Sequence, residues 1–140
     1  MSSFKIFDIA GSGMAAQSVR LNTVASNLAN AESVSGDPKL AYRARHPVFE
    51  AVRASVVAGQ NNDVGAGVRV KSIVESQAAP EARFEPGNPL ANAEGYIYAP
   101  NVNAVEEMVD MISASRAYQN NVEVMNTSKE LLLATLRLGQ

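Results

Sequence analysis

Residues 101–138 read NVNAVEEMVDMISASRAYQNNVEVMNTSKELLLATLRL, a stretch without proline or glycine. When Met108 is placed at position a of a heptad, the a and d positions are mostly apolar. They hold Met108, Met111, Ser115, Tyr118, Val122, Met125, Lys129, Leu132 and Leu136. An apolar seam that continues for about four heptads is typical of a helix that packs along another helix. The stretch therefore predicts one long α-helix that needs a partner.

The beginning of this helix carries a capping signal. Asn103 can accept hydrogen bonds from the first free backbone amides, and Glu106 follows three residues later, as in a capping box. A helix of about 35 residues would be about 50 Å long. That is too long for an ordinary helix in a compact domain of this size, so its partner must also be long.

The N-terminal residues 4–31 show a second helical pattern. Apolar residues recur every seven positions at Phe7, Met14, Leu21 and Leu28, and Ala10, Gln17, Val24 and Ala31 lie between them. Gly11 and Gly13 would each cost about 1 kcal/mol in a helix interior, so this helix should be marginal alone. We expect the two helices to pair as an antiparallel, coiled-coil-like hairpin. Two long helices cannot bury all their faces on each other, so further association is expected.

The middle of the chain reads as a small β-rich part. Residues 67–76 alternate and then change phase, which predicts a strand with a bulge. Residues 82–85 and 95–100 are candidates for further short strands, and residues 59–67 read as a polar loop. The predicted fold is thus mainly α, with a helical domain of residues 1–33 and 101–140 and a small β-rich domain of residues 34–100.

Composition excludes several classes of function. The chain has 140 residues, 12 basic and 14 acidic, and no cysteine. No basic patch is visible for nucleic acid, and no apolar run approaches the ~20 residues that span a bilayer. Asp8 interrupts the apolar N-terminal segment, which argues against a cleaved signal peptide. His46 is the only histidine, without a triad or metal-ligand pattern around it. We expect no enzymatic activity, metal, cofactor or small-molecule substrate.

Four segments resemble the bacterial flagellar rod and hook protein family, and specifically its proximal rod branch. They are SNLANA (26–31), AYRARHPVFEAV (41–52), NPLANAEGYIYAPNVN (88–103) and PNVNAVEEMVDMISASRAYQNNVEVMN (100–126). The resemblance covers nearly the whole chain, in the order of the family. Residues 32–36, Glu-Ser-Val-Ser-Gly, depart from the threonine, glycine and aromatic residue that usually follow the first motif in the broader family.

The resemblance implies a structural subunit of the flagellar basal-body rod. Such subunits pair their terminal helices and assemble with other rod proteins and with copies of themselves into a tube that carries torque to the hook. They are exported, without a cleaved signal peptide, by the flagellar type III apparatus to the rod in the periplasm.

Two sets of residues are then expected to carry assembly. The residues expected to form the helix–helix and subunit contacts are Phe7, Met14, Leu21, Val24, Leu28, Met108, Met111, Ile112, Tyr118, Val122, Met125, Leu132 and Leu136. The residues expected to set the register, which belong to the family motifs, are Asn27, Asn30, Asn101, Asn103 and Glu106. Alternative readings are a cytosolic coiled-coil adaptor or secretion chaperone, and a peptidoglycan hydrolase, although no convincing carboxylate pair supports the latter.

Overall fold

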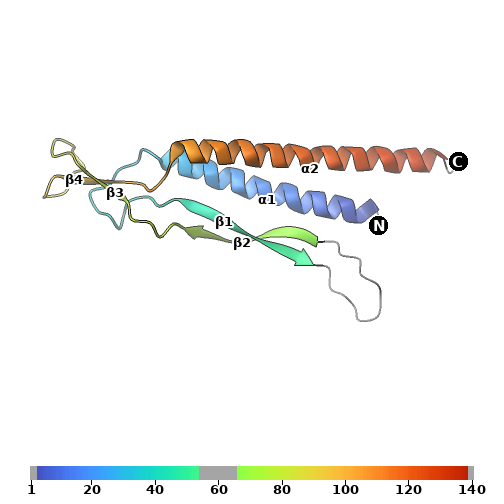
Figure 1. Ribbon diagram of the computed structural model, residues 1–140, viewed down its shortest axis with the longest axis horizontal. Helices are drawn as coiled ribbons and strands as arrows, with labels where there is room; N and C mark the ends of the chain where they lie inside the picture. The colour runs from blue at the N-terminus through green and yellow to red at the C-terminus, as the bar shows by residue number, and fades with distance from the viewer. Residues whose placement is uncertain (1–2, 54–65, 139–140) are drawn as a thin grey trace.

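The computed structural model describes residues 3–53 and 66–138, which form two long helices and four strands (Figure 1). In chain order the elements are α1 (Ser3–Asn30), β1 (Arg45–Arg53), β2 (Ala66–Glu75), β3 (Glu81–Phe84), β4 (Tyr96–Ala99) and α2 (Ala104–Leu138). The predicted helical and strand segments are confirmed to within a few residues. Of the predicted polar loop 59–67, residues 59–65 lie outside the described part, and residues 66 and 67 already belong to β2.

The two helices lie side by side and run in opposite directions (Figure 1). Arg20, in the second half of α1, donates a hydrogen bond from Nη2 to Asp110 Oδ1, 2.8 Å away, near the start of α2. Nearer the start of α1, Gly13 faces Asn121. The predicted antiparallel pair is therefore confirmed. α2 is the longer helix, and its C-terminal end extends past the beginning of α1 (Figure 1).

The heptad alignment that places Met108 at position a describes the contact with α1 only in part. Glu107, Ala114 and Ser128 are buried, whereas Met108 is 54% exposed. The buried positions 107, 114 and 128 lie one residue before the predicted a positions 108, 115 and 129. The reason is close packing, because small and polar side chains let α2 approach α1 while the larger apolar ones stay outside.

The approach of the helices explains one of the two helical glycines. A Cβ built on Gly13 would lie 2.8 Å from Asn121 Nδ2, whereas a Cβ on Gly11 would meet nothing within 4 Å. The absence of a side chain at position 13 makes room for the Asn121 amide, which donates to the carbonyl of Ala117 within α2. Gly13 therefore permits the close helix contact.

β1 and β2 form an antiparallel hairpin that packs along α1, on a different side from α2 (Figure 1). Val48 pairs with Ser72 and Phe49 pairs with Val70, so Lys71 is the extra residue of a bulge. This confirms the phase change predicted for residues 67–76. The amide of Val68 donates to Ser12 Oγ over 3.1 Å and ties the hairpin to α1.

β3 and β4 form a second, separate two-stranded sheet at the far end of the helix pair (Figure 1). Tyr98 and Ser35 exchange two backbone hydrogen bonds of 2.8 and 3.1 Å, which attach this sheet to the segment after α1. The turn before β4 needs Gly95, whose φ of 81° is unfavourable for other residues. The β-rich part of the chain thus consists of two small sheets.

The interior is built mostly from alanine. The buried hydrophobic residues are Ala10, Ala16, Val24, Ala41, Ala44, Ile97, Ala99 and Ala114. The chain exposes 9879 Å², whereas a compact monomer of this size exposes about 7,000 Å². An extended shape with small residues inside leaves many large apolar side chains on the surface.

Candidate assembly interface

One buried asparagine joins four parts of the molecule. Asn27 is fully buried, and its Nδ2 donates to Glu107 Oε1 and to the carbonyl of Arg45, both at 2.9 Å. Its Oδ1 accepts from the Tyr42 hydroxyl and from the amide of Arg45, also at 2.9 Å. Every donor and acceptor of this amide is used. The junction therefore links α1, the segment before β1, β1 itself and α2.

Among the described residues of this junction, Glu107 is the member that has a buried, unpaired oxygen. Its side chain is buried, and Oε2 has no hydrogen-bond partner in the described part of the chain. Burial raises the pKa of the Glu107 carboxyl; the hydrogen bond from Asn27 and the nearby His46 oppose this, and Asp110 and Glu106 add to it. An ionised carboxylate with one unpaired oxygen is costly inside a protein.

The other expected register residues fix local structure. Asn101 Oδ1 accepts from the amide of Ala44 and its Nδ2 donates to the carbonyl of Ala78, both at 2.8 Å. Asn103 caps α2, because its Oδ1 accepts from the amides of residues 105 and 106. Asn30 Nδ2 bonds back to Ser26 within α1, and Glu106 is exposed at the start of α2.

The expected contact residues of α1 form one row. Phe7, Met14, Leu21 and Leu28 are half-buried, and only Val24 is fully buried. Residues seven apart stay on one side of a helix, so the row follows the edge of the α1–α2 contact. It is partly available to another chain.

The expected contact residues of α2 divide into two groups. The half-buried group lies toward α1 and comprises Met111, Val122, Met125 and Leu132. The exposed group comprises Met108, Ile112, Tyr118 and Leu136. Val105, Val109, Leu131 and Leu133 are also exposed and extend this group. Among the described residues, a large apolar area of α2 therefore has no partner in the same chain.

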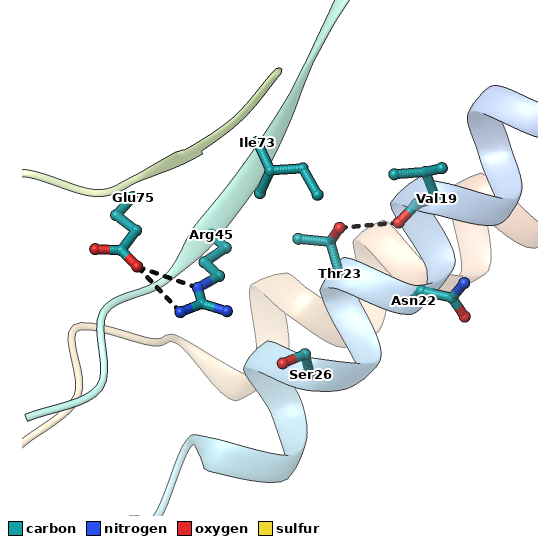
Figure 2. A pocket seen from close by; sticks show the side chains of 7 residues that line it. All are labelled: Val19, Asn22, Thr23, Ser26, Arg45, Ile73 and Glu75. Atoms are coloured by element: carbon teal, nitrogen blue, oxygen red, sulfur yellow. Dashed lines mark hydrogen bonds and ion pairs between the residues drawn. The ribbon is translucent and has the colours of Figure 1, made fainter. Parts of the chain in front are cut away.

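A hollow of about 540 Å³ lies between α1 and the β1–β2 hairpin (Figure 2). Its lining residues are Val19, Asn22, Thr23, Ser26, Arg45, Ile73 and Glu75. Arg45 donates to Glu75 Oε1 at one end, and the Ile73 side chain extends toward α1. Thr23 Oγ1 is occupied by a bond to the Val19 carbonyl. The hollow is open, and the described side chains that line it form no cluster of reactive groups.

Within residues 3–53 and 66–138, no three His, Asp or Glu side chains gather as a possible metal site. His46 is exposed at the start of β1. No helix in the described part of the chain is long and apolar enough to cross a membrane. The most prominent surface feature of the described residues is the set of exposed apolar side chains on α2.

Sequence reasoning missed Glu107 and Tyr42 as members of the junction. Glu107 follows Glu106, and both look like acidic residues placed for the helix dipole. The sequence did identify one member of the junction, Asn27, as a residue that sets the register. Its side-chain partners Tyr42 and Glu107, however, lie 15 and 80 positions away in the sequence. Local patterns carry no information on such distant pairs.

Two family models match the two ends of the chain. Residues 7–36 match the model described as "Flagella basal body rod protein". Residues 93–138 match "Flagellar basal body rod FlgEFG protein C-terminal". These segments include nearly all of α1 and all of α2, the elements that carry the expected contact residues.

Whole proteins also match along their full length. The chain is 54% identical to "Flagellar basal-body rod protein FlgC" of Salmonella typhimurium over 140 residues, covering all of both chains. The protein of the same name from Escherichia coli O157:H7 is likewise 54% identical over both full chains. The one from Bacillus subtilis is 34% identical over an alignment of 151 residues that also covers both chains entirely.

Proposed function

The chain belongs to the FlgC family of flagellar basal-body rod proteins, and we propose that α1 and α2 form the wall of the rod by packing against neighbouring subunits. It is a structural subunit of the flagellar basal body. The observation that carries the proposal is the inverted distribution of apolar residues. Alanine dominates the interior, while large side chains such as Met108, Ile112 and Leu136 are more than half exposed.

In this proposal the two parts of the chain have different tasks. The helical domain, residues 1–33 and 101–140, makes the contacts between subunits, and the β-rich domain of residues 34–100 lies along α1 and at one end of the helix pair. Contacts of one surface with a different surface on the next subunit produce an open helical assembly when the rotation does not close a ring. Many such contacts in parallel would resist twisting, so the assembled rod would transmit motor torque to the hook.

Several residues are assigned to these contacts. The half-buried row Phe7, Met14, Leu21 and Leu28 and the buried Val24 support the helix pair from the α1 side. Met108, Ile112, Tyr118 and Leu136 face other subunits, and Met111, Val122, Met125 and Leu132 support the pair from the α2 side. Asn27 holds the register, because a buried amide accepts only one arrangement of partners. The other motif residues support it by fixing local structure; they are Asn30, Asn101, Asn103 and Glu106.

We further propose export by the flagellar type III apparatus, without a cleaved signal peptide, to the part of the rod in the periplasm. A helix pair with an alanine-rich interior supports this route, because it has little burial to lose when the chain is unfolded for passage. Purification of the chain from basal bodies with Met1 or Ser2 as its first residue would agree. Loss of a longer N-terminal segment would contradict the proposal.

The assembly role is tested by Leu136→Asp. Leu136 is 68% exposed, so the variant should keep the helix content of the wild type in circular dichroism. A charge in an apolar subunit contact would be buried without a partner, so the variant should fail to build rods and to support swimming. Ala134→Asp is the matched control on the same exposed turn and should swim. Normal swimming with Leu136→Asp would show that this end of α2 is not part of the subunit interface.

A further inference from the structure

The molecule is layered in one direction. α1 lies between α2 and the β1–β2 hairpin, and α2 packs on α1 but on neither of these strands (Figure 1). The outer surface of α2 and the space between α1 and the hairpin therefore lie on opposite sides of the molecule. Both surfaces carry an unusual feature.

The feature on α2 is an apolar ridge of four residues. Val105, Met108, Val109 and Ile112 are 70%, 54%, 61% and 55% exposed. Their spacing of three and four residues places them on one stripe of the helix. The stripe that faces α1 contains the buried Glu107 and Ala114 instead, so the ridge is turned away from α1.

The feature on the other side is the hollow between α1 and the hairpin (Figure 2). Val19 and Thr23 form part of its α1 wall, and Ile73, which is 51% exposed, forms part of its hairpin wall. Its volume of about 540 Å³ leaves room for several aliphatic side chains. It is thus a concave, partly apolar counterpart to the convex ridge.

The ridge and the hollow lie at the same height along the helix pair. Arg20 bonds to Asp110, and Asn27 bonds to Glu107. These two bonds align the second half of α1, which lines the hollow, with the first turns of α2, which carry the ridge. A sideways shift of the whole molecule, without a shift along its length, brings the ridge of one copy to the hollow of the next.

We infer that a second copy of this chain inserts the Val105–Ile112 ridge into the α1–hairpin hollow of its neighbour. The contact rests on the proposed rod function and gives it a specific lateral interface. Because the ridge and the hollow are different surfaces, each copy keeps one free surface of each kind, and the contact can repeat around the rod. Both halves of the contact are present on this chain, which is the reason for assigning the occupant to a second copy.

Disulfide cross-linking tests the contact, and the natural chain has no cysteine to interfere. The variant carries Ile112→Cys and Ile73→Cys with an affinity tag, and it is expressed together with the wild-type chain so that rods form in either case. The two cysteines lie on opposite sides of one molecule, so a bond between them must join two copies. A disulfide requires Cα atoms within about 7 Å.

After mild oxidation of purified basal bodies, we expect dimers and higher multiples of the tagged chain, which return to monomer on reduction. The matched control replaces Ile112→Cys by Ser113→Cys, an exposed neighbour on a different side of α2, and should stay monomeric. If the tagged chain is present in rods but forms no cross-link, the contact between ridge and hollow is wrong, while the proposed rod function still stands. A cross-link to a different protein, identified by mass, would overturn the assignment to a second copy. Rods that contain neither the tagged nor the wild-type chain would overturn the proposed function as well.

Discussion

At the residue scale, the junction of Asn27 and Glu107 decides how the helices align. A fully satisfied buried amide has no equivalent arrangement one helical turn away, so it opposes sliding of small-residue surfaces past each other. The sequence identified Asn27, since it stands in a family motif. It could not identify Glu107, because burial of a carboxylate depends on what packs over it and not on its neighbours in sequence.

Glu107→Gln should stabilise the folded monomer at neutral pH. The glutamine can still accept from Asn27 Nδ2 through its oxygen, and it removes the buried charge whose Oε2 has no partner. Thermal unfolding followed by circular dichroism at pH 7 should give a higher Tm for the variant. Glu106→Gln is the control, since Glu106 is exposed and favours the helix N-terminus; it should not raise the Tm.

The same substitution has a predictable pH dependence. Folding raises the pKa of Glu107 above its ordinary value of 4.5, so the folded chain binds more protons than the unfolded chain above that pH. The stability that Glu107 contributes is fully present below pH 4.5 and is lost as the pH rises through the raised pKa. The advantage of Glu107→Gln should therefore shrink toward pH 4. An advantage that grows on acidification would contradict the assignment.

At the element scale, the sequence predicted both helices and the segments of β2, β3 and β4, because periodicity and turn residues are local signals. It did not identify the positions where the helices approach most closely, because it assumed that the largest apolar side chains face the partner. The contact instead uses Ala114, Gly13 and Asn121. Close packing of small residues against each other cannot be read from apolarity alone.

The two helical glycines should respond differently to alanine. Gly11→Ala adds a Cβ in open space and should raise the free energy of unfolding by up to about 1 kcal/mol. Gly13→Ala should raise the free energy of unfolding by less, because its Cβ would lie 2.8 Å from the Asn121 amide. When Asn121→Ala removes this amide, Gly13→Ala should raise the free energy of unfolding as much as Gly11→Ala does. Equal effects of the two single substitutions in urea unfolding would show that the helices are not so close at position 13.

At the scale of the whole molecule, exposed apolar surface is the dominant property. Nineteen large hydrophobic side chains are exposed among the described residues, which is far more than scattered surface positions require. The sequence indicated that one intramolecular partner could not cover both helices. It could not say which faces remain free, since that depends on the position of the β1–β2 hairpin on α1.

High-resolution electron microscopy of purified basal bodies tests the central claim most directly. The account predicts density for this chain in the rod, with α1 and α2 paired in the wall and with Met108, Ile112 and Leu136 covered by neighbouring subunits. A rod in which the chain is present but these α2 side chains face open solvent would contradict the account, and so would a complete rod that lacks the chain.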